Sequence, residues 1–221
     1  MQTKTKKLTI MAAFSAMAFI VMVLIKVPIV PSLPFLKYEP KDVIITIGGF
    51  IFGPMASFLI SLVVSFIEMM TVSDTGYIGL IMNILATCSF SCTAAYIYKK
   101  KHTIQGAILG LTAGAVFMIV VMLLWNYLIT PIYMKIPRDA VAKLLLPSIL
   151  PFNVLKSGLN ATLTIFLYKP VITALRRAKL ISTTNEGGSV SRGKLNMGVM
   201  IIAGVILLTC IIFVLVLRDV I

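Results

Sequence analysis

The segment Met197 to Leu217 places the strongest constraint on the fold, because its 21 consecutive residues include no charged side chain. A helix of about 20 apolar residues spans the hydrocarbon core of a bilayer. Similar apolar runs recur along the chain, and only 12% of its 221 residues are charged, against roughly 25% in soluble domains. Such a chain cannot cover itself with a charged surface in water, so the sequence predicts an all-α integral membrane protein.

Proline and glycine divide the apolar runs into six helices and a seventh. Four prolines between residues 27 and 41 end the first helix, and Gly53-Pro54 is a turn signal between the second and the third. The second helix is short, so we expect it either to tilt in the membrane or to lie partly in the protein interior. The six expected helices cover residues 8–26, 43–52, 55–70, 77–98, 104–130 and 147–175.

A Gly/Ser-rich stretch separates this unit from the last apolar run. Glycine and serine favour a flexible linker. The expected organisation is a six-helix membrane domain over residues 1–180, a polar cytoplasmic linker over 181–196 and an additional transmembrane helix over 197–217. The first helix follows basic residues as in a signal peptide, but no clean cleavage site follows it, so we expect it to be retained.

The net charge of +13 does not indicate a nucleic-acid partner, because the basic residues cluster at the ends of apolar runs, as in Lys99, Lys100 and Lys101. Positions of this kind suit lipid head groups and the excess of basic residues on the cytoplasmic side. With a cytoplasmic N-terminus, the inner segments hold twelve of the 20 lysines and arginines and the outer segments seven. In that count Lys41 and Asp42 are outer-loop charges. The distribution predicts a multi-pass protein whose N-terminus is cytoplasmic.

Lys156 is the most informative single residue, because a lysine in the middle of a span costs roughly 2.5–3.5 kcal/mol on insertion scales. Asn153, Lys156 and Asn160 are spaced i, i+3 and i+7, so they share one helical face. This pattern favours a polar binding face. The alternative is a lysine that extends to the head groups while its methylene stem stays in the lipid.

A second polar and aromatic cluster comprises Trp125, Asn126, Tyr127, Thr130 and Tyr133 at the outer end of the fifth helix. A buried asparagine needs hydrogen-bond partners, which favours a binding role. The alternative is an aromatic belt at the membrane interface.

Glycines mark two further positions. Gly79 and Asn83 lie one turn apart on the fourth helix, where the glycine would let a ligand approach the backbone or would simply allow helix packing. Gly106, Gly110 and Gly114 recur every four residues, which predicts a helix-packing stripe.

Several chemistries find no support in the sequence. Residues 188–195 nearly match a P-loop, but Leu195 replaces the Ser/Thr that binds magnesium and no strand precedes it. The chain has one histidine, and its three cysteines, Cys88, Cys92 and Cys210, lie in apolar runs, so we expect no metal site and no disulfide framework. A lipid-processing enzyme would need a cluster of carboxylate or histidine side chains within the membrane spans. Only Glu68 lies near an expected span. We expect a protein that is not an enzyme.

Four motifs in order carry a family resemblance: Phe35 to Pro40, Gly48 to Pro54, Trp125 to Tyr127 and Leu150 to Lys156. Together they resemble the riboflavin-specific S component of energy-coupling factor (ECF) transporters over about residues 8–178. The resemblance implies a six-helix subunit of the bacterial cell membrane that binds one vitamin at its outer face. Its implied partners are a transmembrane coupling protein and two cytoplasmic ATPases, with no cofactor. The seventh helix departs from the family.

The resemblance also implies roles for individual residues. The loop after the first helix, residues 27–41 (the cap loop), would cover the vitamin, and Ala12 and Ala16 would dock the coupling protein. Amides such as Asn126 and Asn153 suit the pyrimidine edge of a flavin, and thiamine or a pyridoxine-like vitamin is the alternative ligand. The implied substrate-binding residues are Leu36, Lys37, Tyr38, Glu39, Gly79, Asn83, Trp125, Asn126, Tyr127, Asn153 and Lys156.

Overall fold

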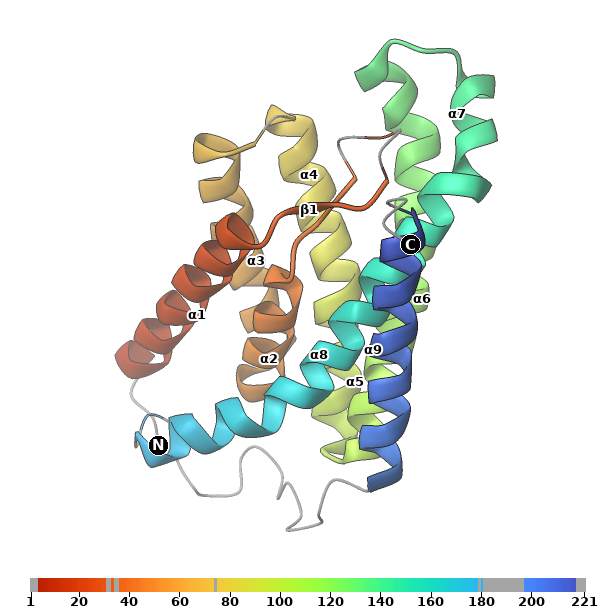
Figure 1. Cartoon of the computed structure of the whole chain (residues 1–221). Helices are drawn as coiled ribbons and strands as arrows, with labels where there is room; N and C mark the ends of the chain where they lie inside the picture. The colour runs from red at the N-terminus through yellow and green to blue at the C-terminus, as the bar shows by residue number, and fades with distance from the viewer. Residues whose placement is uncertain are drawn as a thin grey trace.

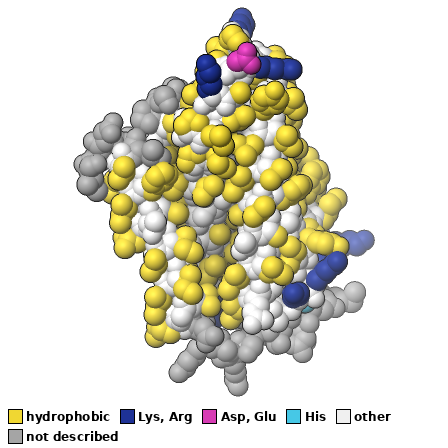
Figure 2. All heavy atoms as spheres, turned by 90° about the vertical axis from the view of Figure 1, so that its right-hand side faces the viewer, with side chains coloured by type: hydrophobic (Ala, Val, Ile, Leu, Met, Phe, Trp, Pro, Cys, Tyr) yellow, Lys and Arg dark blue, Asp and Glu magenta, His cyan; other side chains and the backbone are white. Residues whose placement is uncertain are grey.

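The computed structural model describes residues 4–30, 33, 36–73, 75–178, 180 and 197–217, and these form a bundle of long helices (Figure 1). Within these residues, six helical runs are long and apolar enough to cross a membrane. On the face drawn in Figure 2, apolar side chains cover the middle of the bundle and lysine and arginine side chains gather at its two ends. The all-α membrane fold is therefore confirmed.

The helices follow the predicted order, with differences at their ends. The fourth expected helix is continuous from Gly76 to Lys101 but contains a π-helical segment, Cys88–Cys92. The sixth begins earlier than residue 147, because Arg138 already starts a helical run that continues to Arg177. The elements are α1 (Lys4–Leu24), β1 (Val27–Pro28), β2 (Lys37–Tyr38), α2 (Lys41–Phe52), α3 (Pro54–Thr71), α4 (Gly76–Thr87), α5 (Thr93–Lys101), α6 (Ile104–Met134), α7 (Arg138–Leu144), a second π-helical segment (Leu145–Ile149), α8 (Leu150–Arg177) and α9 (Met197–Leu217).

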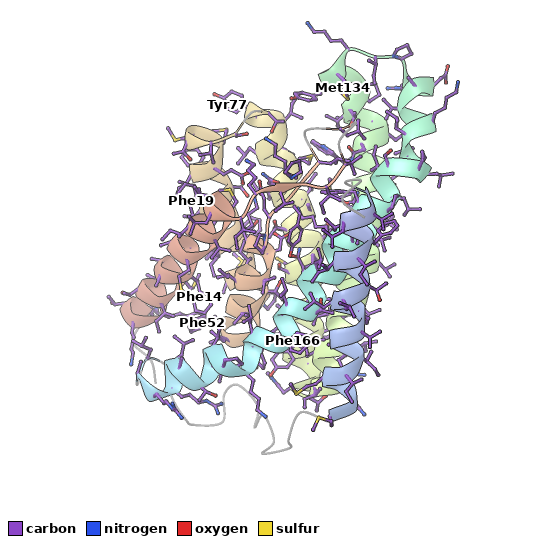
Figure 3. All side chains as sticks on the ribbon, in the orientation of Figure 1. Phe14, Phe19, Phe52, Tyr77, Met134 and Phe166 are labelled. Carbon is purple, nitrogen blue, oxygen red and sulfur yellow. The ribbon has the colours of Figure 1, made fainter. Side chains whose placement is uncertain are left out.

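Helix α2 is a short helix inside the bundle. Its 12 residues reach about 18 Å, which is less than a bilayer core. Most of its side chains are buried, and Phe14 of α1 and Phe52 of α2 lie in the same region of the packed interior (Figure 3). Gly53 ends α2 with a φ of 94°, a conformation that glycine adopts without strain, and Pro54 begins α3 at a position where no backbone donor is needed.

The glycine stripe on α6 brings this helix close to α5 and to the π-helical segment that precedes α5. A Cβ at Gly110 would lie 2.7 Å from the carbonyl oxygen of Ala94, and one at Gly114 would lie 2.5 Å from that of Phe90. Only hydrogen fits at such distances. The helix-packing prediction for these glycines is confirmed.

The cap loop crosses the bundle between α1 and α2 (Figure 1). Its short strands pair antiparallel, with Val27 opposite Tyr38 and Pro28 opposite Lys37. Apolar side chains of the loop are buried against α8. The loop therefore lies on the protein.

Helix α9 packs along α8, on the side of the bundle opposite α1 (Figure 1). Most of its side chains are exposed, which suits a helix that faces lipid on most of its circumference. The predicted linker, residues 181–196, and the P-loop-like stretch within it lie outside the described residues.

Candidate ligand-binding site

A cavity of about 200 Å³ lies beneath the cap loop. It is found at the same end of the bundle as Tyr77 and Met134 (Figure 3). The cap loop, α3, α4, α6 and α8 all contribute to its wall, so the site exists only when these elements pack together. Its lining comprises Lys26, Leu36, Lys37, Glu39, Glu68, Ser73, Thr75, Met82, Asn83, Ala86, Met122, Tyr133, Phe152, Asn153 and Lys156.

Lys41 joins the cap loop to α3 beside this cavity. Its ammonium pairs with Glu68, and it lies 3.0 Å from Glu39 Oε2. Lys26 lies 3.3 Å from the other oxygen of Glu39. Lys41 is only 1% exposed, and a buried ammonium needs such partners to offset the loss of hydration.

Asp42 is the centre of a second buried polar group. Its carboxylate accepts hydrogen bonds from Thr87 Oγ1 at 2.6 Å and from Asn160 Nδ2 at 3.1 Å. Lys156 Nζ lies 3.6 Å from the same carboxylate. Asn160 in turn accepts a hydrogen bond from the hydroxyl of Tyr38. The cap loop and α8 are thus tied to the first turn of α2.

The six charged residues of these two groups balance: three lysines (Lys26, Lys41 and Lys156) face three acids (Glu39, Asp42 and Glu68). Burial alone would raise the pKa of Glu39, but the ammonium groups of Lys41, Lys156 and Lys26 lower it below its ordinary value. Lys37 also lines the cavity, so the wall as a whole carries one more lysine than acids.

Six of the predicted site residues line the cavity: Leu36, Lys37, Glu39, Asn83, Asn153 and Lys156. The Nδ2 of Asn153 donates to the carbonyl of Ile149, which leaves its oxygen as an acceptor for a ligand. The alternative in which Lys156 reaches the head groups is wrong, because this lysine is buried beside Asp42.

The other five predicted residues do not line the cavity. Asn126 donates to Met122 O and accepts from Thr130, so its amide is occupied within α6. Trp125 is half-buried and packs against a hydrophobic cluster that includes Ala86 of α4 and Met122 of α6. Tyr127 is 40% exposed on the outside of the bundle, as expected of an interfacial aromatic residue.

Tyr38 and Gly79 act on the cavity indirectly. Tyr38 is buried behind it and bonds Asn160. A Cβ at Gly79 would lie 1.8 Å from Thr75 Oγ1, so this glycine makes room for a lining side chain and not for a ligand.

Sequence reasoning missed Lys41 and Asp42 altogether. Their assignment as outer-loop charges is wrong, because they are 1% and 0% exposed and begin α2. Two adjacent charges directly before an apolar run, together with Glu68 inside another span, were the available signal. Lys26, Glu68 and Tyr133 were also not assigned to the site, although Tyr133 belongs to the polar cluster noted on α6.

The fold and the site define a membrane-embedded protein with a cavity lined by both apolar and polar side chains. Within the described residues no group of three or more His, Cys, Asp or Glu side chains could hold a metal ion. A family model described as "ECF transporter, substrate-specific component" matches residues 6–168. The chain belongs to this family, and it is therefore a substrate-binding component of a transporter and not an enzyme.

Named relatives cover the same part of the chain. A riboflavin transporter of Staphylococcus aureus is 31% identical over 79% of this chain and 94% of its own length. One of Bacillus subtilis is 29% identical over 80% of this chain and 99% of its own. A solved structure titled "Structure and mechanism of the S component of a bacterial ECF transporter" has a TM-score of 0.66 and 30% identity, covering 79% of this chain and all of that chain.

Proposed function

We propose that this protein binds riboflavin in the cavity beneath the cap loop and is the subunit that selects it for uptake. The observation that carries the proposal is the cavity itself, whose wall combines apolar side chains with amide groups and buried ion pairs. The names of the relatives at 29% and 31% identity support the same ligand.

The chemistry of the wall suits a flavin. Met82, Met122 and Phe152 provide apolar surface for a flat ring. Asn153 provides an acceptor and Lys156 a donor, which complement the alternating donors and acceptors of the pyrimidine edge and the ribityl hydroxyls. The cavity of about 200 Å³ is smaller than the ~300–1,000 Å³ of typical ligand sites, so binding requires the lining to move outward.

The charges of the wall also distinguish riboflavin from thiamine. Three lysines (Lys26, Lys37 and Lys156) and two acids (Glu39 and Glu68) line the cavity. Thiamine carries a permanent positive charge, which an excess of lysines repels. Riboflavin is neutral and adds no unpaired buried charge, so the wall favours riboflavin.

We infer that the free face of α1 docks a transmembrane coupling protein, which acts with two cytoplasmic ATPases. Ala12 and Ala16 are exposed and lie one turn apart, and such small residues let helices approach closely. Helix α9 covers α8 on the other side of the bundle and leaves this face open (Figure 1). The distribution of basic residues supports a bacterial cell-membrane location with a cytoplasmic N-terminus.

Purification of the full chain in detergent tests the ligand. We expect flavin absorbance in the purified protein and saturable quenching of riboflavin fluorescence, with a Kd below about 1 μM. Thiamine and pyridoxine added in excess should not restore the fluorescence. A colourless protein that does not quench riboflavin would overturn the proposal.

A further inference from the structure

Helix α9 lies beyond the region that the family model matches, which ends at residue 168, yet it packs in an ordered way. Ala203 is buried, and Leu207, Cys210 and Val214 pack against the cluster formed by the cap loop and α8. These four residues follow the spacing of a single helical stripe. One face of α9 is therefore devoted to the bundle, while its other faces are exposed.

The contact between α9 and α8 is close. A Cβ at Gly158 would lie 3.3 Å from the Sγ of Cys210, which is tight for two side chains. Gly158 is not among the residues that line the cavity. The glycine thus allows α9 to pack directly on the part of α8 that carries Lys156.

The same hydrophobic cluster holds the cap loop in place. It joins Ile29, Val30, Leu33, Leu36 and Tyr38 of the loop to Phe152, Leu155 and Leu159 of α8. Leu36 and the residues on either side of Tyr38, which are Lys37 and Glu39, line the cavity. Weaker packing in this cluster would therefore displace the cap-loop residues that line the cavity.

Tyr38 lies close to α9 as well as to α8. Burial raises its pKa, and the nearby groups of Asp42 and Cys210 raise it further. Its hydroxyl donates to Asn160 Oδ1 at 3.1 Å. Tyr38 is therefore held by a hydrogen bond to α8 and belongs to the hydrophobic cluster against which Cys210 of α9 packs.

We propose that α9 is a positioning element of the ligand cavity, which supports the cluster that seats Leu36 and Tyr38. Side chains of a fixed helix pack more densely than fluid acyl chains. Helix α9 therefore holds Leu36 and Tyr38 in position in a way that lipid alone does not. The consequence for the ligand depends on the proposed function, whereas the seating of the loop can be measured without any ligand.

The test compares two adjacent leucines in the full, ligand-free chain. Leu207 packs on the cluster, while Leu208 is 59% exposed. Hydrogen exchange is measured at the amides of residues 36–39, which include that of Leu36, bonded to Leu33 O at 2.9 Å. We expect Leu207→Ala to speed this exchange about three- to tenfold and Leu208→Ala to leave it unchanged.

A second matched pair repeats the comparison on the same helix: Val214→Ala on the cluster side and Val216→Ala, at 48% exposed, on the outer side. Equal exchange at residues 36–39 within both pairs would overturn the proposal. An equal acceleration of hydrogen exchange in α3 and α6 would also overturn it, because α9 would then stabilise the whole bundle and not the cap loop in particular.

The ligand provides a separate measurement. Leu207→Ala should release riboflavin faster by a factor similar to the change in exchange. If neither variant nor the unaltered chain binds riboflavin, the proposed function fails while the exchange result still decides the role of α9.

Discussion

Lys156 Nζ lies 3.6 Å from a carboxylate oxygen of Asp42, and this ion pair joins the N-terminal part of α8 to the first turn of α2. Asp42 has no exposed surface, and Lys156 is 7% exposed at the cavity. The carboxylate holds the ammonium at the cavity wall, where its remaining hydrogens are available to a ligand. The pair thus connects the stability of the bundle to the chemistry of the site.

Lys156→Ala should weaken riboflavin binding at least about tenfold, because a polar edge of the ligand loses its partner. Fluorescence titration measures the affinity, and thermal unfolding shows whether the variant remains folded with Asp42 unpaired. Lys169→Ala, an exposed position on the same helix, is the control and should bind normally. Unchanged affinity in Lys156→Ala would remove this lysine from the site.

Tyr38→Phe removes one hydroxyl and leaves Asn160 Oδ1 without its donor. A buried acceptor without a partner costs about 1–3 kcal/mol, so the midpoint of thermal unfolding should fall by several degrees, at roughly 2–4 °C per kcal/mol. Tyr96→Phe is the control, since Tyr96 is 52% exposed. The same midpoint in both variants would show that the bond to Asn160 contributes nothing.

Asn153→Ala and Asn126→Ala separate the two asparagines that a flavin site could use. Asn153 lines the cavity, whereas the amide of Asn126 is occupied within α6. We expect Asn153→Ala to lower riboflavin affinity about tenfold and Asn126→Ala to change it less than about twofold while lowering thermal stability. A comparable loss of affinity in Asn126→Ala would show that Asn126 also contributes to riboflavin binding.

The folded protein should lose stability in acid when Glu39 is protonated. Its pKa is lowered below the ordinary value of 4.5 in the folded protein, where burial is opposed by Lys41, Lys156 and Lys26. Its stabilising contribution is therefore complete above pH 4.5 and is lost as the pH falls through the lowered pKa. Thermal unfolding between neutral pH and pH 3 should show a smaller decline in Glu39→Gln, and an identical decline would contradict the prediction.

Ala12→Leu combined with Ala16→Leu should prevent assembly with the coupling protein, because the larger side chains keep helices apart. Riboflavin binding should be unchanged, since these alanines lie on the outer face of α1. Co-purification of the complex measures assembly, and Ala142→Leu, exposed on α7, is the control. A complex that forms normally with the double variant would place the docking surface elsewhere.

The sequence by itself determined the membrane class, the order of the helices and the importance of Lys156. Apolar run length, the prolines of the cap loop and the glycine stripe on α6 are properties of neighbouring residues, so they can be read along the chain. Four motifs in order were sufficient to indicate the family that the comparison with known proteins confirmed.

Only the tertiary structure decided which polar residues meet. Asp42 lies 118 positions from Asn160 in the sequence, yet the two share a hydrogen bond, and Asn126 matches a flavin-site motif but is occupied within its own helix. Such pairings depend on which helices are neighbours and how each is rotated, and the apolar pattern leaves both open. The packing of α9 on α8 is of the same kind, because a helix without charged residues carries no signal of the face that it buries.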